Sequence, residues 1–396
     1  MYIKREVGSQ LKEAAGEYSV VAILGPRQSG KTTLAKHVFS KHRYVSLEDY
    51  DIRLRAQTDP RGFLHDYPSK QGIILDEIQH VPELLSYIQT IVDEEKKKGF
   101  FIITGSQNIL VNQAISQTLA GRIAIITLLP LSIAEIDQAR LLLENIEKAV
   151  FAGSYPALYA QELSIARLYQ GYIATYLERD VRQIKNITDL LLFKKFIGLC
   201  AGRTGQTVNY SALGHDCGID DKTVKGWLSV LEATYIIFFV PHYYKNFGKQ
   251  IVKSPKMYFV DTGLVCSLLR IKSADELIDH SMRGPLFETY IMSDLLKQHY
   301  NREMIPALYF WRDRTGNKID CLIDMGSKQT PIEIKSSKTV IPSFFNAINY
   351  WKSLTKNNKT QAYVIYGGSE NQEWSLGNVL GWKSLGDLLK KLLAKS

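Results

Sequence analysis

The stretch YSVVAILGPRQSGKTTLAK, residues 18–36, decides the fold of the first part of this chain. Its apolar half predicts a buried strand over 18–24. Residues 25–32 then match the pattern G-x-x-x-x-G-K-[ST] at every fixed position, and a helix is expected to follow. Glycines let successive backbone N–H groups curl around a phosphate, and the helix adds the positive end of its dipole. The stretch therefore predicts a phosphate-binding loop between a strand and a helix.

The residues of this loop have separate expected roles. Lys31 is expected to reach the β- and γ-phosphates, and the hydroxyl of Thr32 to ligate Mg²⁺. The other expected nucleotide contacts are Gly25, Pro26, Arg27, Gln28, Ser29, Gly30 and Thr33. A glycine-rich turn without a ligand is the alternative. The strand before the loop and the helix after it count against that alternative, because phosphate binding requires both.

A second motif, IILDE at residues 73–77, is an apolar strand that ends in two carboxylates. Asp76 is expected to hold the Mg²⁺ shell through water, and Glu77 to polarise the attacking water. The next apolar strand, in GFFIITGSQN, also ends in polar side chains. The candidate sensors of the γ-phosphate there are Ser106, Gln107 and Asn108. Ordinary loop polarity explains these three residues equally well.

Short apolar runs alternate with amphipathic segments through about residue 135, which indicates βαβ units. Strands are expected at 18–24, 43–47, 72–76, 99–104 and 122–128. The chain has 396 residues, of which 45% are apolar and 22% charged, and this is globular composition. The predicted fold class is α/β, with a parallel sheet of the P-loop NTPase type and helices on both of its faces.

Cysteine spacing and hydropathy exclude several classes of protein. The four cysteines form no C-x-x-C pair, so a zinc knuckle, a thioredoxin motif and a disulfide framework are not expected. No apolar stretch approaches 18 residues, and the first residues lack the apolar segment of a signal peptide. We therefore expect a cytoplasmic protein. The net charge of +9 is compatible with nucleic acid as a partner without establishing it.

Four motifs resemble a prokaryotic family of AAA+-like ATPases: ILGPRQSGKTTLAK, IILDEIQHVPELL, IITGSQN and LAGRIAIITLLPLSIAE. In that family the ATPase core is joined to a C-terminal domain of unknown function. FAGSYPALY and YIATYLERDV extend the resemblance, which covers nearly the whole chain. It implies binding and hydrolysis of ATP with Mg²⁺, and no single biological role.

In such ATPases an arginine acts on the γ-phosphate of a neighbouring subunit. The candidates are Arg122 in LAGR and Arg179 in YLERD. Action in trans requires a homo-oligomer. For each arginine a structural salt bridge is the alternative.

The change of pattern along the chain predicts three domains. Residues 1–135 form the ATPase core, 136–275 a helical lid with a winged-helix-like module, and 276–396 an α/β domain. In the second domain, the segments 131–153 and 164–183 have the 3.6-residue spacing of helices.

The segment 210–234, YSALGHDCGIDDKTVKGWLSVLEAT, predicts a helix, a turn and a helix, with Asp220 or Asp221 as N-cap of the second. A hairpin of apolar strands follows. Early in the second helix, where such a helix meets the major groove, are Lys222, Thr223 and Lys225. The hairpin adds residues suited to DNA backbone contact and stacking: Lys245, Lys249, Lys253, Lys256, His242, Tyr243, Tyr244 and Phe247. The alternative is a module for protein contacts, with the lysines as a solvated rim.

The last domain carries carboxylates and a lysine in a fixed order. Glu288 lies on a predicted helix, Asp320 on the strand IDCLID, and Glu333 and Lys335 on the strand PIEIKS. Strand alternation puts Glu333 and Lys335 on the same face. Carboxylates with a lysine can hold Mg²⁺ and orient a water for attack on a phosphodiester. Lys335 would stabilise the developing negative charge or help activate the water.

This order resembles the PD-(D/E)xK nuclease core, except that Ile319 precedes the aspartate in place of proline. The resemblance implies that Asp320, Glu333 and Lys335 are catalytic, and that Glu288, Asp320 and Glu333 ligate the metal. The alternative is a retained fold whose carboxylates serve structure or docking without cleavage. Asp324 is a second candidate ligand, although a hairpin-end aspartate explains it more simply.

The sequence thus predicts an ATPase that acts on nucleic acid, with DNA favoured, and that carries a metal-dependent nuclease-like domain. The second hypothesis is an ATP-dependent switch or scaffold that binds DNA or a protein partner without cutting. A helicase or translocase ranks last, because no strand-separation element is identified.

Overall fold

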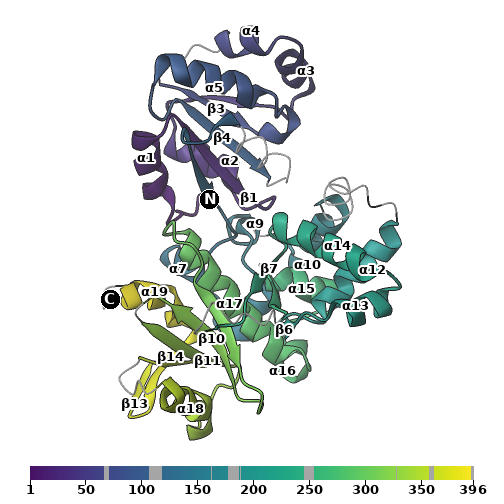
Figure 1. Cartoon of the computed structure of the whole chain (residues 1–396), viewed down its shortest axis with the longest axis vertical. Helices are drawn as coiled ribbons and strands as arrows, with labels where there is room; N and C mark the ends of the chain where they lie inside the picture. The colour runs from purple at the N-terminus through teal and green to yellow at the C-terminus, as the bar shows by residue number, and fades with distance from the viewer. Residues whose placement is uncertain are drawn as a thin grey trace. The chain divides into compact units, whose positions relative to one another are not determined.

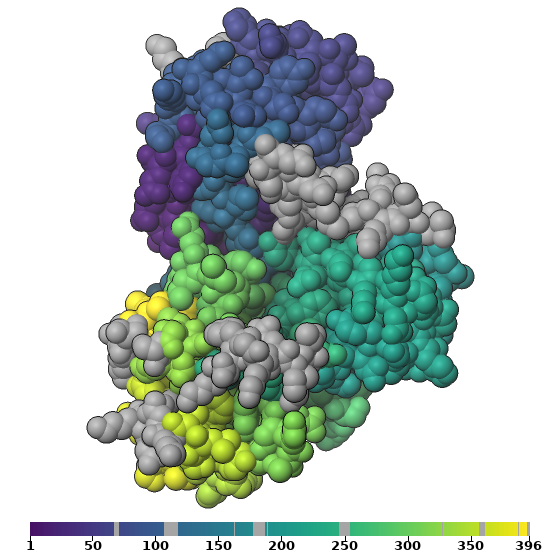
Figure 2. All heavy atoms as spheres, viewed as in Figure 1, coloured from purple at the N-terminus to yellow at the C-terminus, as the bar shows by residue number. Residues whose placement is uncertain are grey.

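The structure is a computed structural model, and it describes most of the chain. The described residues are 1–66, 71–106, 118–161, 163–176, 187, 189–244, 254–326, 328–355 and 361–393, without the side chain of Asp387. The remaining residues are grey in Figures 1 and 2. The chain divides into two compact units. The first unit comprises 1–131, 233–235 and 300–304, and the second comprises 132–232, 236–299 and 305–396.

The first unit is built on a five-stranded sheet in the order β2-β3-β4-β1-β5 (Figure 1). All of its strand pairs are parallel. The strands are β1 (Val20–Gly25), β2 (Arg43–Ser46), β3 (Ile73–Asp76), β4 (Phe101–Ser106) and β5 (Ile123–Thr127). Each lies where an apolar run predicted it, so the parallel α/β architecture is confirmed.

Alternate side chains of β1 enter two separate hydrophobic cores, because successive residues of a strand point to opposite faces. Val21 and Ile23 join one core, and Val20 and Ala22 join the other. The first core is covered by α1 (Gly8–Glu17) and α2 (Lys31–Val38). The second is covered by α3 (Tyr50–Thr58), α4 (Pro60–His65) and α5 (Leu84–Glu95). Helices therefore cover both faces, as predicted.

The second unit begins with short helices. They are α7 (Ile133–Gln138), α8 (Ile146–Ala152), α9 (Pro156–Ala160) and α10 (Ile165–Tyr172). The helical spacing over 131–153 thus belongs to two helices. Ser132 and Glu135 form a capping box that opens α7, and Arg140 has a left-handed φ of 58° just after its end. Asn145 then caps α8 by accepting from the Lys148 N–H. Local capping therefore divides a pattern that is periodic throughout.

A helical module with a small sheet comes next in the second unit. Its elements are α12 (Leu190–Ala201), β6 (Gln206–Thr207), α13 (Tyr210–Cys217), α14 (Asp221–Ala233), β7 (Ile237–Val240) and β8 (Lys256–Phe259). The strands pair antiparallel in the order β6-β8-β7, so the expected hairpin of β7 and β8 is present. Asp220 accepts from the Thr223 N–H at 2.9 Å and caps α14. Two short helices follow, α15 (Thr262–Leu268) and α16 (Glu276–Asp279).

The rest of the unit is a six-stranded mixed sheet in the order β13-β14-β12-β11-β10-β9, preceded by the long helix α17 (Arg283–Tyr300) (Figure 1). The strands are β9 (Leu308–Arg312), β10 (Lys318–Asp324), β11 (Gln329–Lys335), β12 (Tyr363–Tyr366), β13 (Gln372–Trp374) and β14 (Gly377–Gly381). The helical elements are η4 (Pro342–Phe345), α18 (Asn346–Thr355), η5 (Trp382–Asp387) and α19 (Leu388–Leu393). A core of Ile319, Leu322, Ile348 and Trp351 seats α18 on one face of the sheet.

Over the part of the chain that the structure describes, no helix is both long enough and apolar enough to span a bilayer.

Candidate functional site

The phosphate loop connects the end of β1 to the start of α2, and two of its glycines are needed for its shape. A Cβ on Gly25 would lie 2.1 Å from the carbonyl oxygen of Leu128, so only glycine allows this close approach. Gly30 has a left-handed φ of 91° immediately before Lys31 opens the helix. The two fixed glycines of the motif therefore meet local steric requirements of the strand–loop–helix turn.

Lys31 lies over the loop that precedes it. Its Nζ donates to the carbonyl oxygens of Gly25 at 3.1 Å and Pro26 at 2.8 Å, and its side chain is buried. Burial lowers the pKa of Lys31, while the carboxylates of Glu77 and Asp76 oppose that change. A buried ammonium that hydrogen-bonds carbonyl oxygens gains a stronger partner when a phosphate arrives. The contact of Lys31 with the β- and γ-phosphates stays a prediction.

Asp76, at the end of β3, gathers three hydroxyl groups. Thr32 Oγ1 donates to Asp76 Oδ1 at 2.8 Å, Tyr44 donates to Oδ2 at 2.8 Å, and Thr104 donates to Oδ1. Burial and the bond to Asp76 raise the pKa of Tyr44 to about 12, so its hydroxyl stays a donor at neutral pH. The sequence predicted Thr32 and Asp76 as partners in the metal site. Tyr44 and Thr104 could be found only from the pairing of β2 and β4 with β3.

These residues fit the Mg²⁺ that the motif implies. A threonine hydroxyl and an aspartate carboxylate lie side by side, and both are the hard oxygen ligands that Mg²⁺ prefers. In the same loop the Ser29 hydroxyl is fully buried and has no hydrogen-bond partner in the described part of the chain. An unpartnered buried hydroxyl in a phosphate loop is consistent with a ligand that this group still has to meet.

Glu77 follows Asp76 with a left-handed φ of 58°, a backbone conformation that is uncommon for a residue other than glycine. Its carboxylate accepts a hydrogen bond from the side-chain amide of Gln79. The same amide lies 3.0 Å from the hydroxyl of Ser106, which ends β4 and pairs in register with Gly25. Ser106, a candidate sensor of the γ-phosphate, therefore lies beside the loop. The other two candidates, Gln107 and Asn108, lie outside the described residues.

Arg5 is a residue of this site that the sequence patterns did not indicate. It is 5% exposed, and its guanidinium donates to the carbonyl oxygens of Ser29 at 2.8 Å and Leu129 at 2.7 Å. It thereby ties the phosphate loop to the segment after β5. No local signal marks an arginine 24 positions before its partner.

Replacing Arg5 by alanine is expected to destabilise the first unit. Two buried carbonyl groups would lose a charged donor, which costs about 2–4 kcal/mol of unfolding free energy. Native-state hydrogen exchange of the β1 amides measures this local stability. Lys4→Ala is the matched control, since Lys4 is exposed and adjacent. Equal exchange in both variants would contradict a structural role for the guanidinium.

The arginine candidates for action in trans have different outcomes. Arg122 stands just before β5, where its carbonyl accepts from the Val20 N–H at the amino end of β1, the end opposite Gly25. Its guanidinium is partly exposed and pairs with both carboxylate oxygens of Asp93. Arg122 is therefore remote from the phosphate loop of its own chain, and its action on a neighbouring subunit stays a prediction. Arg179 lies outside the described residues.

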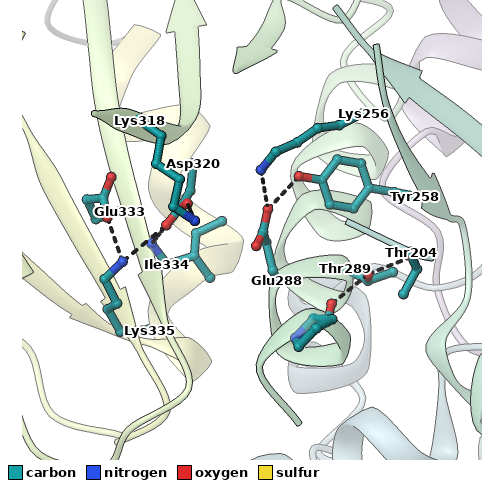
Figure 3. Close-up of polar contacts among 11 residues, drawn as sticks. Thr204, Lys256, Tyr258, Glu288, Thr289, Lys318, Asp320, Glu333, Ile334 and Lys335 are labelled. Atoms are coloured by element: carbon teal, nitrogen blue, oxygen red, sulfur yellow. Dashed lines mark hydrogen bonds and ion pairs between the residues drawn. The ribbon is translucent and has the colours of Figure 1, made fainter. Parts of the chain in front are cut away.

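The C-terminal site brings Asp320, Glu333 and Lys335 together on β10 and β11 (Figure 3). Lys335 Nζ donates to Glu333 Oε2 at 2.6 Å and to Asp320 Oδ2 at 3.3 Å. The backbone N–H of Ile334 donates to Asp320 Oδ2 at 3.1 Å. Lys318, which alternation puts on the same face as Asp320, lies 3.1 Å from its Oδ1. The predicted same-face placement of Glu333 and Lys335 agrees with these contacts.

Glu288 is directed toward a different set of groups. Its Oε1 accepts from Lys256 Nζ at 2.8 Å and from the Tyr258 hydroxyl at 2.6 Å, and both donors belong to β8 (Figure 3). Among the described residues there is no group of three acidic, histidine or cysteine side chains that could hold a metal ion. The three carboxylates predicted to share a metal therefore do not form one ready-made cluster.

Lys256 and its neighbours also differ from the expected surface for stacking and DNA contact. Lys256 is 9% exposed, and its ammonium forms an ion pair with Glu288 instead of facing solvent. His242 is buried against Phe310, and Tyr243 packs against Trp351. These hairpin residues join the small sheet to β9 and α18. The other named residues of the hairpin, except Tyr244, lie outside the described part: Lys245, Phe247, Lys249 and Lys253.

The charges of the C-terminal site shift its pKa values in opposite directions. Burial opposes ionisation of Asp320, but Lys335 and Lys318 outweigh it and lower the pKa of Asp320 to about 2. Burial and the charge of Asp320 raise the pKa of Glu333 to about 8. Burial works against the Lys335 ammonium, yet the two carboxylates raise its pKa to about 12. The pKa of Lys335 therefore lies well above neutral pH, and the pKa of Glu333 lies above the usual range of a glutamate.

The pKa of Glu333 predicts a pH dependence of stability. A carboxyl group whose pKa rises from 4.5 to about 8 on folding binds its proton more tightly in the folded state, so stability falls as pH rises through this window. The melting temperature of Glu333→Gln minus that of the wild type should therefore increase as the pH is raised from 5 to 8.5. The exposed residue Glu373 of β13 supplies the control Glu373→Gln, expected to gain nothing. A constant difference between Glu333→Gln and the wild type would contradict the raised pKa.

Comparison with known families finds matches to three parts of the chain. Residues 17–137 match a family described as an AAA domain. Residues 143–275 and 283–385 match two families described as domains of unknown function, DUF8612 and DUF4143. The first part of the chain is therefore similar to an AAA domain, and the descriptions of the other two families state no function.

Relatives and solved structures resemble larger parts of the chain. It is 25% identical over 341 residues to uncharacterized protein Rv2008c of Mycobacterium tuberculosis, covering 85% of this chain and 74% of the relative. An uncharacterized protein of Haemophilus influenzae is 24% identical over 274 residues, covering 62% of this chain and 68% of the relative. The Walker-type ATPase PABY2304 of Pyrococcus abyssi is similar with a TM-score of 0.45 and 17% identity, covering 68% of this chain and 96% of that one.

Proposed function

We propose that the first unit binds ATP with Mg²⁺ and hydrolyses it. One observation carries this proposal: the Thr32 hydroxyl lies 2.8 Å from the Asp76 carboxylate, next to the loop that Lys31 covers. In this arrangement the loop N–H groups and Lys31 bind the phosphates. Thr32 and Asp76 would hold the metal, and Glu77 would orient the attacking water. When bound, Mg²⁺ neutralises charge on the phosphate oxygens.

Release of inorganic phosphate from ATP by the purified full chain, with Mg²⁺ and with EDTA, tests this proposal. We expect turnover that requires the metal. Binding of ATP without any turnover would reduce the first unit to a nucleotide-dependent switch. Failure to bind ATP at all would refute the assignment of the phosphate loop.

We further propose that the C-terminal site hydrolyses phosphodiesters of nucleic acid, DNA above all, with a divalent cation. The supporting observation is that Asp320, Glu333 and Lys335 converge on one face of β10 and β11, with Lys318 beside them. Asp320 and Glu333 would hold the cation. Lys335, which stays protonated, would stabilise negative charge on the scissile phosphate. A bound cation would supply an activated water.

Nucleic acid as the partner is supported by charge and by the helical module. The sequence α12-β6-α13-α14 followed by the β7–β8 hairpin is consistent with a winged-helix-like unit. Lys222 and Lys225 at the start of α14 are exposed, which suits contact with phosphates. Assembly into an oligomer, with Arg122 acting on a neighbouring subunit, belongs to the same proposal.

The alternative is an ATP-dependent switch or scaffold that binds DNA or a protein without cutting. This alternative is favoured because each carboxylate of the C-terminal site already forms an ion pair with at least one lysine. The pairs are Lys256 with Glu288, Lys318 and Lys335 with Asp320, and Lys335 with Glu333. The two functions differ in one measurement, the cleavage of end-labelled single- and double-stranded DNA with Mn²⁺ or Mg²⁺. No cleavage of either substrate would favour the switch.

A further inference from the structure

A pocket of about 440 Å³ lies between α10 and α15 of the second unit, two helices that are in contact and are drawn side by side in Figure 1. Its apolar lining includes Phe151 of α8, Ile165 and Ile173 at the two ends of α10, and Ile271 just after α15. The pocket shares no residue with the phosphate loop or the C-terminal site. It belongs to the region 143–275, whose family description states no function.

The two helices are fixed against each other where Tyr169 and Gly263 line the pocket. A Cβ on Gly263 would lie 2.4 Å from the Tyr169 hydroxyl oxygen, so only glycine allows α15 to approach α10 this closely. The same hydroxyl lies 2.8 Å from the carbonyl oxygen of Ala152 and 2.6 Å from the carboxylate of Asp261. The pocket is therefore built before any ligand arrives, which lowers the entropic cost of binding.

Two exposed cations, Arg270 and Lys272, also line the pocket. Among the described residues, neither side chain has an ion-pair partner, and none of the residues that line the pocket is acidic. The nearby carboxylate of Glu276 accepts from the backbone N–H of Lys272 at 2.8 Å and so fixes the turn that carries this lysine. An apolar pocket edged by unpaired cations is complementary to a ligand that carries negative charge beside an apolar group.

The exposure of the lining residues favours a protein segment as the ligand. Ala166, Gln170, Arg270 and Lys272 are all exposed, so the pocket is open to solvent, whereas small-molecule sites bury about 70–90% of their ligand. Tyr169 is fully buried and offers no ring face on which a nucleobase could stack.

We propose that this pocket docks an acidic, amphipathic segment of a partner protein. One aliphatic side chain of the segment would lie between α10 and α15, and its carboxylates would pair with Arg270 and Lys272. This arrangement follows the general rule that alternating apolar and charged anchors of a peptide are recognised by an apolar groove with a complementary charged edge. The inference goes beyond ATP hydrolysis and DNA cleavage and depends on neither activity.

Binding of synthetic peptides to the purified full chain tests this inference. The probes are short fluorescein-labelled peptides in which glutamates flank a central leucine, isoleucine or methionine, and fluorescence anisotropy measures their dissociation constants. We expect saturable binding of at least one of these peptides. Replacing its central residue by serine, or its glutamates by lysine, should weaken binding at least about tenfold, because each change removes one of the two features that the pocket recognises.

Arg270→Gly is the decisive variant. Arg270 has a left-handed φ of 60°, a conformation that glycine adopts readily, so the variant should stay folded. Its peptide binding should be at least about tenfold weaker, because a charged contact is lost. Arg140→Gly is the matched control, since Arg140 is exposed, has a left-handed φ of 58° and is not among the described residues that line the pocket. This control should bind the peptide as the wild type does.

Absence of binding by every peptide would overturn the inference. Equal losses in Arg270→Gly and Arg140→Gly would also overturn it, because they would indicate an effect of net charge alone. Binding of a labelled single-stranded oligonucleotide that only Arg270→Gly abolishes, with no peptide bound, would assign the pocket to nucleic acid instead. Self-association in sedimentation velocity that only Arg270→Gly abolishes would make the occupant a second copy of this chain and overturn the assignment to a partner. ATP hydrolysis and DNA cleavage are measured separately, and their proposals stand or fall independently of these results.

Discussion

Replacing Lys31 by alanine is expected to lower the rate of ATP hydrolysis by about 10²–10³-fold, the effect typical of removing one preorganised charge donor from a reacting group. The ammonium of Lys31 is already aligned over the loop by the carbonyl groups of Gly25 and Pro26. Its charge is available to the phosphates without rearrangement of the helix that carries it. Phosphate release at saturating ATP measures the loss.

The control for this experiment is Lys12→Ala. Lys12 lies on the exposed side of α1. Its replacement by alanine removes an equal charge from the same unit. Its ATPase rate should stay within about twofold of the wild type, as is usual for surface substitutions. Because Lys31 is buried, the melting temperature of Lys31→Ala is compared first. Unchanged hydrolysis by a folded Lys31→Ala protein would refute the assignment of the phosphate loop.

The second large effect is expected at the C-terminal site. Asp320→Asn should lower metal-dependent cleavage of labelled DNA on the order of 10³-fold, because a bound cation supplies several kcal/mol of transition-state stabilisation and each 1.36 kcal/mol is tenfold in rate. Asparagine also leaves Lys318 and Lys335 without their shared carboxylate. ATP hydrolysis should stay unchanged, since it takes place in the other unit.

Asp324→Asn is the matched control, since it makes the same chemical change on the same strand. Asp324 accepts from the Gly326 N–H and from Gln329 at the end of the hairpin, so its carboxylate has a structural use. Cleavage should persist in this variant. Equal loss in both variants would indicate that the change acts through the fold of β10. Cleavage that survives Asp320→Asn would refute the site.

The two sites differ in how much of them the sequence could predict. The phosphate loop lies within eight consecutive residues, and its glycines are required by local steric contacts. A linear motif therefore describes the loop well. Strand alternation was also sufficient to put Glu333 beside Lys335. Patterns of this kind depend only on neighbours in sequence.

The partners that the sequence missed come from distant elements. Tyr44 and Thr104 reach Asp76 because β2 and β4 flank β3 in the sheet. No local sequence pattern predicts this strand order. Lys256 meets Glu288 across 32 residues, and this contact removes it from the surface predicted for DNA. Periodicity over 131–153 likewise could not show that caps divide the helix. Tertiary pairing decides such cases.

The contact of Arg5 with the phosphate loop bears on how the ATPase can be isolated. A fragment cut to the family match, 17–137, would keep every residue of the nucleotide motifs and lose this guanidinium. The carbonyl groups of Ser29 and Leu129 would then need water in a place the arginine now fills. Domain dissection that begins at the first strand would therefore understate the activity of the intact chain, and the boundary to use is the amino terminus.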